Sequence, residues 1–140
     1  FRLIGQGISL TVNEVSIGSN LTWHTVPALV SLVGAARAKE MILLGRTYGA
    51  AELDTLGFAT EVVPDEELLA RAEALAGEIC NQPPMPVWSS KASINACARA
   101  LDRSVQHMDH LAVAFMNQSE NSRIARETYF SKSDRTYVDE

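Results

Sequence analysis

Residues 65–80 carry the pattern that most restricts the fold of this 140-residue chain. Apolar side chains recur there at positions i, i+1, i+4, i+7, i+8 and i+11, which form one stripe along an α-helix. Asp65 stands where a helix cap is expected, and Glu66 and Glu67 suit the positive end of the helix dipole. Such a helix requires another element to cover its stripe. The stripe consists of Leu68, Leu69, Ala72, Leu75, Ala76 and Ile79.

Short strands are expected before this helix. Residues 3–17 are rich in β-branched and apolar side chains interrupted by glycine and asparagine, which predicts strands at 8–12 and 15–17. Residues 59–63 predict a further strand, and Pro64 ends it. The chain therefore mixes short strands with helices.

Other helices are predicted on both sides. Residues 35–44 are a run of helix formers, and Gly45 lies where a left-handed C-terminal cap is expected. Residues 50–57 repeat this pattern over a shorter distance. The prolines in residues 83–86 predict an extended connector, because proline restricts its own φ and the conformation of the residue before it.

Two helices should follow the connector. One is expected at about 87–101 and a last, long one from near Arg103. The predicted buried side of the first consists of Val87, Trp88, Ile94, Ala98 and Leu101; the second carries Val105, Met108, Leu111, Ala112, Phe115 and Met116.

The distribution of charge argues against a nucleic-acid partner. The formal net charge is −5, and residues 1–60 hold four of the 12 basic and four of the 17 acidic side chains, so the acidic excess lies in residues 61–140. An acidic surface repels a phosphate backbone. No stretch approaches the roughly 20 apolar residues of a membrane span, and no signal peptide is evident, so we expect a soluble, cytoplasmic protein.

Two sets of potential metal or redox side chains have simpler interpretations. Cys80 and Cys97 form neither a close metal-type pair nor a dense disulfide framework, and are interpreted as small apolar side chains in helices. His107 and His110 are three residues apart, a spacing that can place two imidazoles on one helix face. No third ligand follows at a recognisable interval, so a solvated polar face is favoured and no metal is predicted.

Glu14 is the candidate catalytic residue. It lies between two apolar stretches, shortly before Gly18, at a predicted strand end. A carboxylate there is either solvated or used in chemistry. From composition alone the solvated alternative is favoured, because most glutamates are exposed.

An ordered series of segments carries a family resemblance. In chain order it runs Asn-Glu-Val-Ser-Ile-Gly at 13–18, Val-Gly-Ala-Ala-Arg-Ala at 33–38, Leu-Leu-Gly-Arg at 43–46, Leu-Gly-Phe at 56–58 and Val-Val-Pro at 62–64. This series resembles the C-terminal half of the crotonase superfamily, the enoyl-CoA hydratases and isomerases.

The resemblance implies an α/β protein with the ClpP/crotonase spiral fold, here its last strands and its helical C-terminal region. Residues 1–63 then belong to the β/α core with the active-site strand and loop, and residues 64–140 form a helical oligomerisation region. Family members assemble as trimers or dimers of trimers, so a homo-oligomer is expected. The chain begins at Phe1 rather than methionine, and we expect further sequence before it.

By the same resemblance, Glu14 holds the position of a glutamate that acts as general acid/base on an acyl-CoA thioester. Hydratases use a second glutamate and a pair of backbone N–H groups from an earlier segment, so these 140 residues alone are expected to be inactive. No cofactor is implied, since coenzyme A is part of the substrate. The alternative is a non-catalytic oligomerisation or binding module derived from the same fold.

The loop after Glu14 departs from the common hydratase pattern. Many hydratases have Pro-Gly-Ala-Gly-Gly-Thr there, whereas residues 19–27 are bulkier. Dienoyl isomerases carry an aspartate at the position of Thr22, while Trp23 suits enoyl isomerases that use one glutamate. Trp23 and His24 line the acyl pocket, or Trp23 packs in the core beneath the loop. The substrate-binding residues that the resemblance implies are Gly18, Leu21, Thr22, Trp23, Phe130 and Lys132, the last two near the CoA of an adjacent subunit.

Overall fold

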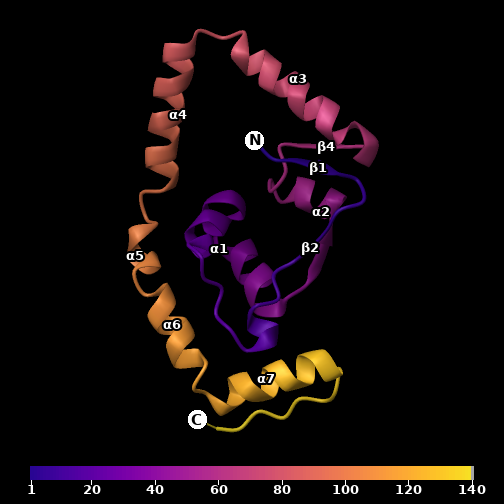
Figure 1. Cartoon of the computed structure of the whole chain (residues 1–140), viewed down its shortest axis with the longest axis vertical. Helices are drawn as coiled ribbons and strands as arrows, with labels where there is room; N and C mark the ends of the chain where they lie inside the picture. Colours follow the sequence, from indigo (N-terminus) through magenta and orange to yellow (C-terminus); the bar gives the residue numbers. More distant parts are fainter. Residues whose placement is uncertain (140) are drawn as a thin grey trace. The chain divides into compact units, whose positions relative to one another are not determined.

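The computed structural model describes residues 1–139, which form two compact units. One unit comprises Phe1–Leu10 and Tyr48–Ala100, and the other comprises Thr11–Thr47 and the segment from Leu101 onward. Figure 1 shows the order of the elements along the chain. The division at residue 63 stays a prediction.

Two small sheets account for the described strands. In the first, β1 (Leu3–Gly5) pairs in parallel with β4 (Glu61–Val63), with Ile4 opposite Val62. In the second, β2 (Ser9–Thr11) pairs with β3 (Thr47–Gly49). Strands β2 and β4 lie within the ranges predicted at 8–12 and 59–63, which confirms both predictions.

Helices cover the first sheet. α2 (Ala50–Thr55) packs against β4, and α3 (Leu68–Cys80) packs against β1. The predicted stripe of α3 is confirmed in part, because Leu69 is 71% exposed while four other members are half-buried. The half-buried members are Leu68, Ala72, Leu75 and Ile79.

Asp65 does not cap the following helix. The short 3-10 helix η2 (Asp65–Glu67) begins after Pro64, and no side chain caps it. The Asp65 carboxylate instead accepts a hydrogen bond from the backbone N–H of Gly7, at 3.0 Å. A tertiary partner thus replaced the local cap that the sequence predicted.

The proline-rich connector is shorter than predicted. α4 spans Pro84–Ala98, so Met85 and Pro86 belong to its first turn rather than to an extended segment. Proline is tolerated there because the first N–H groups of a helix have no intrahelical partner. The predicted buried side is also wrong within the described chain, because Trp88 is 67% and Ile94 65% exposed.

The second unit is built on α1 (Thr25–Leu44). Gly34 interrupts α1 with a non-helical backbone (φ 77°, ψ 160°), so the predicted helix at 35–44 is its second segment. Gly45 adopts the left-handed conformation, as predicted for the C-terminal cap. The first segment of α1 was not predicted from the sequence, although Pro27 in its first turn is compatible with a helix start.

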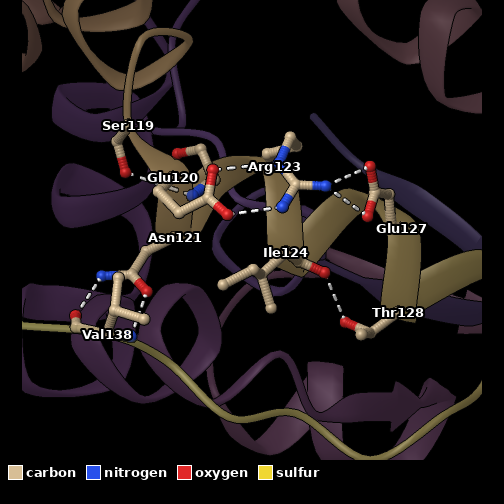
Figure 2. Close-up of polar contacts among 9 residues, drawn as sticks. Ser119, Glu120, Asn121, Arg123, Ile124, Glu127, Thr128 and Val138 are labelled. Atoms are coloured by element: carbon tan, nitrogen blue, oxygen red, sulfur yellow. Dashed lines mark hydrogen bonds and ion pairs between the residues drawn. The ribbon is translucent and has the colours of Figure 1, made fainter.

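Three helices replace the single helix predicted from Arg103. They are α5 (Arg103–Gln106), α6 (Asp109–Met116) and α7 (Glu120–Ser131). α7 starts as a separate helix because the hydroxyl of Ser119 accepts a hydrogen bond from the backbone N–H of Ser122, at 3.1 Å (Figure 2). Most of the apolar side chains predicted for the long helix are exposed, including Phe115 at 72%.

In residues 1–139, none of the helices combines the length and the apolar character that a membrane crossing requires.

Candidate functional site

Glu14 lies at the start of a helical turn and not in a strand. The predicted strand at 15–17 is wrong, because Val15–Ile17 forms the 3-10 helix η1. The carbonyl of Glu14 accepts hydrogen bonds from the N–H groups of Ile17 at 3.1 Å and Ser19 at 2.8 Å. Val15 and Ile17 carry a weak strand preference, and the left-handed Gly18 that closes the turn outweighs it.

The Glu14 side chain has an unusual environment. The residue is half-buried, yet its Oε2 is inaccessible to solvent and has no hydrogen-bond partner among the described residues. Removing a carboxylate oxygen from water without a partner costs free energy, so such an atom marks a site where a ligand, a water or a reacting group is expected. The solvated strand-end alternative is therefore wrong for this oxygen.

The residue before Glu14 is held by α7. The side-chain amide of Asn13 donates a hydrogen bond to the hydroxyl of Tyr129, at 3.1 Å. The Tyr129 ring meets Phe130 edge-on with ring centroids 5.5 Å apart, and the Arg135 guanidinium lies 5.9 Å from the Tyr129 ring centroid. These contacts fix the position of the turn that carries Glu14 relative to α7.

Gly18 makes the closest approach between η1 and α7. A Cβ atom built on Gly18 would lie 2.5 Å from the carbonyl oxygen of Ser122 and 2.9 Å from Cβ of Ala125. Its φ of +75° also favours glycine. Gly18 therefore permits both the end of the turn and the packing of α7 against it.

A cavity of about 580 Å³ opens beside this contact. Its volume is in the range of small-molecule sites. It lies along η1, the residues after η1, and α7, with the C-terminal tail contributing one wall. The lining residues are Val15, Gly18, Ser19, Asn20, Met116, Ser119, Asn121, Ser122, Ala125 and Tyr137.

The other residues predicted for substrate binding fall at different places. Leu21 and Thr22 are buried, with 5% and 7% exposure, and only Gly18 of the predicted set lines the cavity of 580 Å³. Phe130 is 81% exposed on α7, and Lys132 is the left-handed C-terminal cap of that helix. The structure therefore does not gather these residues into one described cavity, and their roles stay predictions.

Trp23 and His24 line a second cavity, of about 440 Å³. Trp23 is 76% exposed, which rules out the alternative that it packs in the core. Both residues adopt left-handed backbone conformations, and the N–H of His24 donates to Oδ2 of Asp109 at 3.0 Å. The other lining residues are Ser19, Thr22, Gln106, Asp109, His110 and Val113.

The exposed face of α7 carries an ion-pair network, drawn in Figure 2. Arg123 binds Glu120 and, at 2.8 Å, Glu127. Hydrogen bonds to Glu120 and then Glu127 raise the pKa of Arg123, and the hydrogen bond from Arg123 lowers the pKa of Glu120. Exposed pairs of this kind contribute little to stability.

The histidines of the C-terminal helices do not form a metal centre. Across residues 1–139, no group of three or more histidine, cysteine, aspartate or glutamate side chains is placed to hold a metal ion. Nδ1 of His107 lies 3.1 Å from the carbonyl oxygen of Arg103, within its own helical segment.

Several residues of the site were not predicted from the sequence. Asn13 lies beside Glu14, and the others lie at the start of α7, on α7 or in the tail after it. Ser119 could have been predicted, because serine is a preferred N-cap residue and its hydroxyl can accept a hydrogen bond from the N–H three residues later. The partners of Asn13 and Asn121 have no local sequence signal. The missed residues are Asn13, Ser119, Asn121, Ser122, Tyr129 and Tyr137.

The fold is crotonase-like. An enoyl-CoA hydratase from Mycobacterium avium subsp. paratuberculosis superposes with a TM-score of 0.86 at 19% identity, covering 98% of this chain and 56% of that one. A methylmalonyl-CoA decarboxylase superposes with a TM-score of 0.77 at 17% identity, covering 97% of this chain and 53% of that one. These likenesses confirm the predicted fold class.

The sequence comparisons then define the family. The family described as enoyl-CoA hydratase/isomerase matches residues 1–140, and the chain belongs to it. The mevalonyl-coenzyme A hydratase of Beauveria bassiana is 30% identical, over 85% of this chain and 44% of its own length. The crotonyl-CoA hydratase of Syntrophomonas wolfei is 27% identical, over 86% of this chain and 47% of its own length. The chain thus spans about half the length of these relatives.

Proposed function

We propose that this chain is the part of an enoyl-CoA hydratase/isomerase that supplies the acid/base residue Glu14 and one side of the acyl-CoA site. The buried Oε2 of Glu14, which has no hydrogen-bond partner among residues 1–139, is the observation that carries the proposal. A structural role does not explain why this oxygen is removed from water without a hydrogen-bond partner. A role in proton transfer explains it, because a reacting carbon or a water molecule then contacts the oxygen when substrate binds.

The chemistry requires one carboxylate that can take and return a proton. In isomerisation, Glu14 removes a proton from a carbon of the acyl chain, the electron pair moves onto the thioester oxygen as an enolate, and the proton returns to another carbon. In hydration, the carboxylate takes a proton from water while the hydroxyl adds to the double bond, and a proton is delivered to the carbon beside the carbonyl. Both routes need donors that stabilise the enolate oxygen.

The family resemblance assigns those donors to an earlier segment of the protein. We therefore expect the backbone N–H pair, and in a hydratase the second glutamate, outside the 140 residues described. The proposed substrate is an acyl-CoA thioester. The relatives support this substrate class, since they include a mevalonyl-coenzyme A hydratase and a crotonyl-CoA hydratase. Phe130 and Lys132 are retained as the proposed contacts for the CoA of an adjacent subunit.

Assembly into trimers or paired trimers is proposed from the family resemblance, and exposed apolar side chains support an interface. Trp88 and Ile94 on α4 are 67% and 65% exposed, and Leu111 and Phe115 on α6 are 55% and 72% exposed. Apolar side chains exposed on a helix in this way are typical of a protein interface. The same observation favours the second candidate, a non-catalytic oligomerisation module in which Glu14 has no chemical role.

A turnover assay separates the two candidates. The whole protein is assayed on crotonyl-CoA for hydration and on a 3-enoyl-CoA for isomerisation, beside Glu14→Gln. We expect the variant to lose turnover on the order of 10²-fold or more, because glutamine keeps the shape of the side chain but cannot accept the proton. Glu73→Gln, at an exposed position of α3, is the matched control and should retain full activity. Equal turnover in both variants would support the non-catalytic module.

A further inference from the structure

The side chain of Asn121 binds the backbone of the C-terminal tail after α7. The amide of Asn121 donates from Nδ2 to the carbonyl of Val138 at 2.7 Å, and its Oδ1 accepts from the N–H of Val138 at 2.8 Å. Figure 2 shows both bonds on the side of α7 that Asn121 presents to the tail. This arrangement uses both polar groups of the amide on one backbone residue, as two paired strand residues use theirs.

The Asn121 amide therefore fixes the neighbouring residue as well. Tyr137 precedes Val138 and forms one wall of the 580 Å³ cavity beside Gly18. Its side chain is half exposed, so part of the ring faces solvent. Residues 133–139 have no helix or strand of their own. The Ser133 hydroxyl hydrogen-bonds to the Ser131 hydroxyl at 2.8 Å, and the Arg135 guanidinium lies over the Tyr129 ring. The two hydrogen bonds of Asn121 hold the backbone of Val138, next to Tyr137.

The cavity is suited to a hydrocarbon chain. Val15, Met116, Ala125 and Tyr137 give it an apolar lining, and it begins at the turn that follows Glu14. None of its lining residues is ionisable except the tyrosine, so nothing in it pairs with a charged ligand. An apolar group that extends away from the reacting carbon at Glu14 would transfer from water into this lining with a gain in free energy.

We propose that Asn121 is a positioning residue. Its hydrogen bonds hold the C-terminal tail in place, so that Tyr137 lines a binding site for the distal part of a long acyl chain. The inference rests on the proposed function only for the identity of the chain as an acyl-CoA. It makes Tyr137 the residue that favours long acyl chains over short ones. We expect a four-carbon acyl group to end before Tyr137, because Glu14 is not among the residues that line the cavity.

The test uses saturated thioesters, which bind without reacting, so its result does not depend on turnover. Butyryl-CoA and decanoyl-CoA are titrated calorimetrically into the whole protein, and hydrogen exchange is followed in residues 133–139. Asn121→Asp removes the donor to Val138 and retains an acceptor. Asn117→Asp makes the same change of charge at an exposed residue whose Oδ1 accepts from Arg126, and serves as the control.

In Asn121→Asp we expect exchange in the tail to quicken on the order of tenfold and decanoyl-CoA to bind about fivefold more weakly, from the loss of one or two hydrogen bonds. Butyryl-CoA binding and the Asn117→Asp control should not change. Tyr137→Ala, a substitution in the tail that leaves the helices intact, should weaken decanoyl-CoA about tenfold through lost apolar contact.

Four results would overturn the inference. Equal hydrogen exchange of residues 133–139 in Asn121→Asp and Asn117→Asp would show that the Asn121 hydrogen bonds do not hold the tail. Parallel weakening of butyryl-CoA and decanoyl-CoA, or unchanged decanoyl-CoA binding in Tyr137→Ala, would show that the ring is not a wall for the chain. Failure of wild-type protein to bind decanoyl-CoA would exclude the acyl site outright. Failure of the proposed function is read separately, from the turnover of Glu14→Gln.

Discussion

Substitution of Gly18 by alanine perturbs the contact on which the site is built. The left-handed backbone of Gly18, with φ of +75°, costs a residue with a Cβ atom about 1–2 kcal/mol. The new Cβ would also lie 2.5 Å from the Ser122 carbonyl oxygen and 2.8 Å from the Ser122 Cα. Both are backbone atoms, so no flexible side chain can move aside, and we expect overpacking to add about 1–3 kcal/mol.

A matched glycine separates these two costs. Gly57 has a similar φ of +69°, but a Cβ built on it meets no atom within 4 Å. Gly57→Ala should therefore show the backbone cost alone, about 1–2 kcal/mol. Urea unfolding of both variants measures the difference. If Gly18→Ala and Gly57→Ala lose equal stability, the close packing of α7 against the Glu14 turn does not exist and the account of the site fails.

Three further predictions concern the core, the pH dependence and the assembly. Leu53 is fully buried, so Leu53→Ala should lower the free energy of unfolding by about 2–5 kcal/mol, whereas Leu69→Ala, at a 71% exposed position, should be nearly neutral in urea unfolding. The hydrogen bond from Arg37 lowers the pKa of Glu40 below its ordinary value of 4.5, so this pair contributes stability above pH 4.5 that is lost as the pH falls through the lowered pKa. Unfolding midpoints on both sides of pH 4.5 should show less acid sensitivity in Glu40→Gln, and equal slopes would contradict the assignment. Trp88→Ser should shift sedimentation of the whole protein toward smaller species, and an unchanged distribution would remove Trp88 from the proposed interface.

Local patterns predicted the helices whose signals lie within a few residues. The helix formers at 35–44 with Gly45 after them, and the half-buried members of the α3 stripe, were found because spacing and caps act over one or two turns. The predictions failed where a distant partner decides. Asp65 binds Gly7, 58 residues away, instead of capping its own helix.

The same distinction applies to the site. Glu14 and Gly18 could be named as candidates from the sequence, because a family pattern and a turn glycine mark them. The residues that hold and wall the site could not, since the Asn13 contact with Tyr129 spans 116 residues and the Asn121 contact with Val138 joins a helix to an irregular tail. The side of α4 predicted to be buried is exposed at Trp88 and Ile94, because an apolar stripe does not reveal whether the same chain covers it.

The most direct test of the account follows the proton itself. The whole protein is incubated with an enoyl-CoA thioester in D₂O, and deuterium incorporation into the acyl group is measured by mass spectrometry. If Glu14 takes and returns the proton, wild-type protein incorporates deuterium into the acyl group. Glu14→Gln should then incorporate it at a rate lower by a factor on the order of 10² or more. Incorporation at the wild-type rate in Glu14→Gln would contradict the central claim.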